Sequence, residues 1–312
     1  MKAKQFFAIT ALGAALFASC SNEEELATGS YPSDNLIRVT AGVNNDMTRS
    51  DEAVTPTSLT QNFSLTVVNN TNDKYSYANE IFSLNGTEWS CGKNLLWQNL
   101  STPVEIVALY PATDANKFTS VYSKENNTVG TITYSVNPDQ SKADEADDLL
   151  LYHNANFKPE KDLEKGKLDI EFNHAFCRVD IEVTIGSEFI ATNGLAENPI
   201  KGIRVEGTKI AADINLASAP STITAKGDAA SIIPTPGDFT PAASAANQAV
   251  ARYSCIVIPQ TAYLNIVLHT SDKEYEWTGT KMALESGKQY TLQLNMTNKS
   301  TTARKFILRE RK

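Results

Sequence analysis

The chain has 312 residues and a formal net charge of −8 at pH 7, with 36 acidic and 28 basic side chains. This acidic balance argues against a nucleic-acid-binding protein and against an electrostatic membrane patch. The length suggests about two domains. Helical periodicity is scarce, whereas short alternating runs rich in Thr, Val, Ile and Tyr recur. The sequence therefore predicts an all-β protein made of β-sandwiches.

Residues 1–19 have the features of a lipoprotein signal peptide. Two lysines precede the apolar run Phe6–Phe17, which is too short to cross a bilayer as a mature helix. Small residues then lead directly to Cys20, as in a bacterial lipobox, where the cysteine is diacylglycerated and acylated. Because two or more acyl chains give stable anchoring, we expect a lipid anchor at Cys20. Residues 20–35, which include an acidic run, are expected to form a flexible tether.

The first strand of the mature protein is predicted directly after this tether. Ile37, Val39, Ala41 and Val43 alternate with polar or small residues, so one face of the segment is almost wholly apolar. Arg49 follows after a short polar loop, in a context typical of exposed chain. A strand followed by an accessible basic residue can be removed by a protease. The alternative is that this is simply the first strand of an ordinary β domain.

Further alternating runs predict the strands of the remaining chain. They include Phe63–Val68, Val104–Tyr110, Thr131–Val136, Leu168–Ile185, Arg252–Ile258, Tyr263–Leu268 and Gln289–Met296. The charged segment His153–Lys165 lacks alternation and is the candidate boundary between an N-terminal sandwich of residues 36–160 and a C-terminal sandwich of residues 161–312. The runs Arg252–Ile258 and Tyr263–Leu268 are expected to form a hairpin.

Two further features concern single stretches. In Leu168–Ile185 the apolar residues move from even to odd positions after Asn173 and His174. Since a strand cannot change face without an extra residue or a break, this shift predicts a β-bulge or tight bend. In the basic tail near the C-terminus, Phe306, Ile307 and Leu308 predict one more strand.

The candidates for catalytic or metal chemistry are few. Apart from Cys20 they are His153, His174, His269, Cys91, Cys177 and Cys255. None has a partner at metal-ligand spacing, and the chain lacks a phosphate-binding glycine loop and a GxSxG motif. We therefore predict no catalytic residues, no metal and no cofactor. The cysteines inside strand patterns fit a core, with a disulfide between two of the three as the alternative. The tryptophans fit a core better than a carbohydrate platform.

The order of these features resembles the fimbrillin-like proteins of Bacteroidales, which are subunits and accessory proteins of type V pili. Besides the lipobox and the first strand with Thr48-Arg49, the resemblance rests on four segments. They are the tryptophan segment Glu88–Trp97, the run VEIVALYP with the later DLLLY, FNHAFCRVDIEV from Phe172, and GKQYTLQLNM from Gly287. The acidic residues after Cys20 also resemble a surface-export signal.

The resemblance implies two transthyretin-like β-sandwiches in tandem, in a lipoprotein of the outer membrane at the cell surface or in a fimbrium. An arginine-specific protease would cut after Arg49. The strand carrying Ile37, Val39, Ala41 and Val43 would then be displaced, and a strand of another pilus subunit would fill its place. The candidate donor is the tail Phe306, Ile307 and Leu308 of a neighbour. The alternative is an uncleaved, surface-exposed lipoprotein, either a pilus anchor or tip or a module that binds a glycan or host protein.

Overall fold

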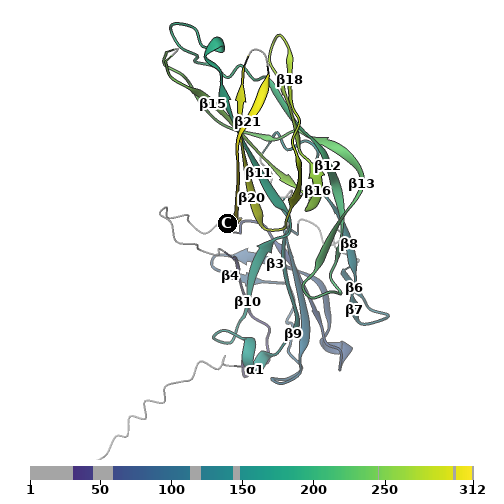
Figure 1. Ribbon diagram of the computed structural model, residues 1–312. Helices are drawn as coiled ribbons and strands as arrows, with labels where there is room; N and C mark the ends of the chain where they lie inside the picture. Colours follow the sequence, from purple (N-terminus) through teal and green to yellow (C-terminus); the bar gives the residue numbers. More distant parts are fainter. Residues whose placement is uncertain are drawn as a thin grey trace, which may run out of the picture.

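The computed structural model describes residues 31–44, 59–112, 121–142, 148–244, 246–297 and 300–310, with the backbone alone for 303–310. More than half of these residues lie in strands and very few lie in helices, so the predicted all-β class is confirmed. Figure 1 shows two β-rich parts placed end to end. The helices within the described residues are short: α1 (Pro159–Asp162) and the 3-10 helices η1 (Asp73–Tyr75) and η4 (Ser187–Phe189). Within the described ranges, no helix is long and apolar enough to cross a membrane.

The N-terminal part is a closed barrel with the strand order β1-β10-β9-β5-β2-β3-β4. Its strands are β1 (Val39–Val43), β2 (Phe63–Val68), β3 (Tyr77–Asn85), β4 (Glu88–Ser90), β5 (Val104–Tyr110), β9 (Leu150–Phe157) and β10 (Leu168–His174). Strands β1 and β10 run parallel, whereas the other neighbours in this order are antiparallel. The inward side chains of these strands share one apolar core.

The C-terminal part is a sandwich of two sheets around a second core. One sheet has the order β14 (Thr235–Thr240), β15 (Ala249–Val257), β11 (Cys177–Ile185), β20 (Lys288–Met296) and β21 (Thr301–Glu310). The other has β13 (Thr222–Ile232), β12 (Gly202–Asn215), β17 (Asn265–His269) and β18 (Glu274–Trp277), with β8 (Thr131–Ser135) also paired to β12. Two small ribbons pair β16 (Gln260–Tyr263) with β19 (Lys281–Leu284), and β6 (Tyr122–Ser123) with β7 (Thr128–Val129).

Each of the two parts contains a strand from the other side of the expected boundary between residues 160 and 161. Strand β10 follows that boundary in the sequence but completes the barrel, and β8 precedes it but pairs with β12. The separation of the sheets therefore does not coincide with the boundary. The division of the chain into two tandem domains stays a prediction.

The bend predicted at Asn173 and His174 is confirmed. Strand β10 ends at His174, and β11 begins at Cys177 after two buried residues. Here the chain leaves the barrel core and enters the sandwich core, which is why its apolar face changes. The expected hairpin was wrong: β15 pairs with β11 and β14, whereas β17 pairs with β12 and β18. The connection between β15 and β17 crosses from one sheet to the other.

Candidate functional site

The first strand, β1, closes the barrel between two unlike neighbours. On one side it pairs in parallel with β10, from Val39 opposite Leu168 to Val43 opposite Phe172. On the other side it meets β4 at a single pair, Val39 opposite Trp89. The residues just before β1 extend this second side, because the N–H of Ile37 donates to the carbonyl oxygen of Leu95 at 2.9 Å. Strand β1 thus occupies a slot between β10 and the segment that follows β4.

The apolar face predicted for this strand points into the barrel. Ile37 and Val39 are 8% and 5% exposed, and the half-buried Ala41 and Val43 pack against the same core. Full burial of an aliphatic side chain is worth about 1.5–3 kcal/mol relative to exposure. Ile37 and Val39 together therefore stabilise the barrel by several kcal/mol, and the two half-buried residues add less.

Aromatic rings form the part of the core nearest to β1. The Phe63 ring lies 4.8 Å from Trp89 in an edge-on arrangement and 5.6 Å from Phe172, measured between centroids. Trp97 and Phe157 stack at 5.6 Å. Such contacts add about 0.5–1.5 kcal/mol each beyond the area they bury. The contacts of Phe63 join β2, β4 and β10 directly, and the Trp97–Phe157 stack joins β9 to the segment that follows β4, so both walls of the slot have packing contacts that do not involve β1.

Polar contacts on the outer face fix the register of β1. The hydroxyl of Thr40 donates to Oδ1 of Asp169 at 2.6 Å, and the Asn44 amide donates to Oδ1 of Asn173 at 3.2 Å. Before the strand, Arg38 makes two hydrogen bonds to the Asp34 carboxylate, at 2.9 and 2.5 Å. These bonds, with help from the backbone N–H of Leu36, lower the pKa of Asp34 to about 2. Because Arg38 is held within the paired segment, it is a poor protease site.

Two of the expected site residues, Cys20 and Arg49, lie outside the described residues. The described chain stops at Asn44 and resumes at Leu59, so the arginine lies in the connection between β1 and β2. The expected donor tail, residues 306–308, lies in β21. There its backbone pairs with β20 of the same chain, with Phe306 opposite Leu292 and Leu308 opposite Tyr290. Strand β21 is the last in its sheet and has a partner on one side only.

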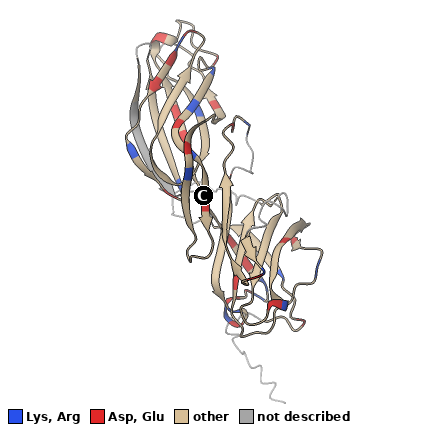
Figure 2. Ribbon diagram, turned by 90° about the vertical axis from the view of Figure 1, so that its right-hand side faces the viewer, with Lys and Arg blue, Asp and Glu red and all other residues tan. Residues whose placement is uncertain are grey.

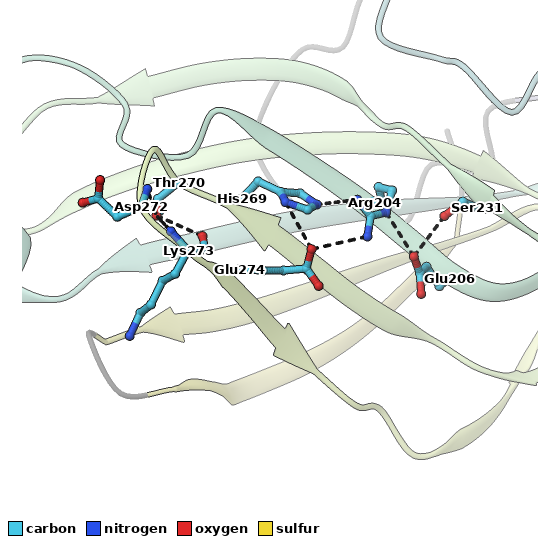
Figure 3. A network of polar contacts seen from close by, with 8 residues as sticks. All are labelled: Arg204, Glu206, Ser231, His269, Thr270, Asp272, Lys273 and Glu274. Atoms are coloured by element: carbon cyan, nitrogen blue, oxygen red, sulfur yellow. Dashed lines mark hydrogen bonds and ion pairs between the residues drawn. The ribbon is translucent and has the colours of Figure 1, made fainter.

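The histidines take part in polar networks rather than in metal clusters. On the C-terminal sheet, His269 lies between Arg204 and Glu274, with Nδ1 3.2 Å from the Glu274 carboxylate (Figure 3). Arg204 also contacts Glu206, which accepts a hydrogen bond from Ser231 at 3.1 Å. These side chains bridge neighbouring strands but are a third to a half exposed, so each ion pair contributes little. Among the described residues, no group of three or more candidate ligands surrounds a metal position.

The remaining candidates are mainly structural. Trp97 is buried in the barrel core, and Trp89 and Trp277 are partly buried against the two cores. Cys177 and Cys255 are free thiols in the sandwich core, and burial raises the pKa of Cys255.

Figure 2 shows Lys and Arg interspersed with Asp and Glu over both parts.

The sequence pattern missed one arrangement of side chains. His153 lies between Glu105 and Ser221, which are 48 and 68 residues away in the sequence. Only the folded strands bring these groups together, and no local motif indicates the contact. A second histidine, His174, pairs with Asp148 at 3.0 Å beside the same part of the junction.

Comparisons with known proteins point in one direction. Residues 48–306 match the model of a family described as fimbrillin-like. A candidate cell adhesion protein of Bacteroides ovatus aligns with a TM-score of 0.61 and 14% identity, over 90% of this chain and 99% of that one. A second such protein, from Bacteroides uniformis, aligns with a TM-score of 0.58 and 13% identity, over 89% of this chain and 99% of that one. A fimbrial protein of Bacteroides vulgatus aligns with a TM-score of 0.52 and 14% identity, over 88% of this chain and 99% of that one. At these identities the structural likeness shows the fold, and no curated protein matches the sequence.

Proposed function

Because the chain belongs to the fimbrillin-like family, we propose that it is an adhesive pilus subunit that assembles by donor-strand exchange at the position of β1. The observation that carries this proposal is the placement of that strand. An N-terminal strand completes the barrel, and Arg49 follows six residues after its last residue. The region matched by the family begins at residue 48, after β1. The strand therefore precedes the matched region in the sequence while completing the barrel.

Proteolysis after Arg49 would leave β1 attached by non-covalent contacts alone. These are the parallel ladder to β10, the hydrogen bonds to the segment after β4, and the buried side chains of Ile37 and Val39. Loss of the strand exposes an apolar slot between two unpaired edges. Such a slot accepts a donor strand through backbone hydrogen bonds, and pockets for alternate side chains select the donor.

The donor in this proposal is the tail of another subunit, with Phe306, Ile307 and Leu308 at its centre. This tail lies in β21, the edge strand of its sheet, which pairs with β20. Because β21 is the last strand of the order β14-β15-β11-β20-β21, its departure leaves the other four strands of the sheet paired. Assembly then exchanges one edge contact within a subunit for a fully enclosed contact between subunits.

The lipid belongs to the same proposal. A diacylated Cys20, followed by the tether of residues 20–35, would carry the chain to the outer membrane and hold it at the cell surface until cleavage. The cut releases the lipid together with β1, so one event frees the subunit from the membrane and opens its slot. The partners are other pilus subunits, and the final location is the fimbrium.

The N-terminus of the protein isolated from cells tests this proposal. We expect a start at Ser50 in assembled material, and we expect Arg49→Ala to retain the lipid and to remain monomeric on a gel that preserves polymers. Arg38→Lys is the matched control, because it removes the other nearby arginine while keeping its charge, and it should assemble normally. Normal assembly of Arg49→Ala would contradict the proposal.

The uncleaved alternative is favoured by a different observation. With β1 in place the barrel is closed and the strand is held by backbone, polar and apolar contacts. A chain that keeps β1 and an acylated Cys20 would serve as a pilus anchor or tip, or would bind a glycan or host protein at the surface. An acylated N-terminus in mature pili would support this function over the subunit role.

A further inference from the structure

A glutamate, a histidine and a serine form a hydrogen-bonded chain where the barrel meets the sandwich. His153 on β9 has Nε2 2.9 Å from Oε1 of Glu105 on β5. Its Nδ1 lies 2.9 Å from Oγ of Ser221, just before β13. The side chains of His153 and Glu105 are only 5% and 16% exposed. Ser221 is half-buried and lines an adjoining cavity of about 280 Å³.

The geometry allows a productive arrangement of the protons in which Glu105 is ionised and His153 is neutral. An ionised Glu105 can only accept a hydrogen bond, so Nε2 of His153 carries the proton that it shares with the carboxylate. The lone pair of Nδ1 then faces Ser221 and accepts its hydroxyl proton. This is the arrangement that activates a weak nucleophile: a base within hydrogen-bond distance of the hydroxyl, held in one tautomer by an acid behind it.

The cavity gives the serine a place to react. Its wall combines apolar side chains, among them Leu151 and Ile223, with the polar side chains of Asn173 and Ser286. The amide and the hydroxyl are groups that can donate hydrogen bonds to an oxyanion. A volume of about 280 Å³ lies just below the range of about 300–1,000 Å³ that is usual for ligand pockets. The space therefore suits a small acyl group better than a polymer.

We propose that Ser221 is a nucleophile for acyl transfer from small carboxylic esters, with His153 as its base and Glu105 as the positioning residue. The Ser221 oxygen forms a bond to the ester carbonyl carbon while its proton moves to Nδ1 of His153. Collapse of the tetrahedral intermediate breaks the bond to the alkoxy group, which leaves with that proton as an alcohol. Water then attacks the acyl-serine by the same route in reverse, and releases the carboxylic acid and the free serine.

A fluorophosphonate probe tests the proposal on the folded, purified protein. The serine oxygen displaces fluoride from phosphorus, so intact-mass and peptide mass spectrometry should show one adduct per chain, located at Ser221. Ser221→Ala should abolish the adduct. Ser218→Ala is the matched control, because Ser218 lies in the same loop but donates to a backbone carbonyl, and it should label like the parent. Hydrolysis of p-nitrophenyl acetate can be followed by absorbance. Ser221→Ala should lose this activity, whereas Ser218→Ala should keep it.

Variants of His153 and Glu105 test whether Ser221 is activated by these residues or reacts only because the probe can reach it. His153→Gln and Glu105→Gln should slow labelling about 100-fold or more, the contribution typical of a positioned base. Circular dichroism checks that each variant is folded, and the unmodified protein provides a readout that needs no variant. Absence of an adduct at Ser221 in the folded parent protein would overturn the proposal. Labelling at an unchanged rate in folded Glu105→Gln and His153→Gln would also overturn it.

Discussion

The contribution of β1 to stability can be measured by removing its two buried side chains. The double variant Ile37→Ala and Val39→Ala deletes roughly five methylene-sized groups, and at roughly 0.8 kcal/mol each this lowers the free energy of unfolding by about 4 kcal/mol. Both side chains are less than 9% exposed, so nearly the full amount applies, and any cavity left behind adds to it. Urea unfolding followed by tryptophan fluorescence suits the site. Trp89 lies opposite Val39, and the backbone N–H of Trp97 donates to the carbonyl oxygen of Asn35.

The matched control lies on the other face of the same segment. Arg38→Ala changes an exposed side chain between the two deleted ones and removes only an exposed ion pair, so it should lower the free energy of unfolding far less than the double variant does. Should the double variant unfold within about 1 kcal/mol of the parent protein, the strand does not contribute to the barrel in solution. The proposed exchange at this slot would then lose its physical basis, because a donor would gain nothing by filling it.

Three further predictions concern single groups. The contact with Arg38 lowers the pKa of Asp34 to about 2 from an ordinary 3.8, so its stabilising effect is complete above about pH 4 and is lost as pH falls through about 2. An NMR titration should show this midpoint and its return toward 3.8 in Arg38→Ala. Gly207 has φ +91°, and an added Cβ would lie 2.2 Å from the carbonyl oxygen of Tyr263, so Gly207→Ala should lower the free energy of unfolding by about 1–3 kcal/mol or more in a urea titration. Maleimide should modify the half-exposed Cys91 in the folded protein, and Cys177 and Cys255 only after unfolding, which mass spectrometry can verify.

The alternation of apolar and polar residues predicted the features that depend on a single strand and the core it faces. The apolar face of β1 follows from Ile37 and Val39, whose side chains enter the barrel as their spacing indicated. The change of face after His174 gave the bend between β10 and β11. These features are encoded locally, because each depends on whether successive side chains point toward a core or away from it.

Pairing between distant strands could not be predicted in the same way. Nothing in β1 specifies a parallel partner at Leu168, more than a hundred residues later, because any strand with one apolar face would fit that edge. The hairpin expected between β15 and β17 failed for the same reason, since proximity in the sequence favoured a pairing that the two sheets of the sandwich exclude. The contact of His153 with Ser221 likewise follows from the junction of two sheets.

In the proposed exchange, the position of β1 gives a physical reason for a protease step. Beyond β1, β10 pairs with β9 at Asn173 and His174, and β4 pairs with β3, so each neighbour keeps an antiparallel contact of its own when the slot is empty. A donor strand with similar side chains gains about the same free energy, so the two strands compete on nearly equal terms. While the chain is intact, the tethered strand has an effective concentration in the millimolar range and excludes the donor. A cut after Arg49 would remove that advantage, and the strand present at the higher local concentration would then occupy the slot.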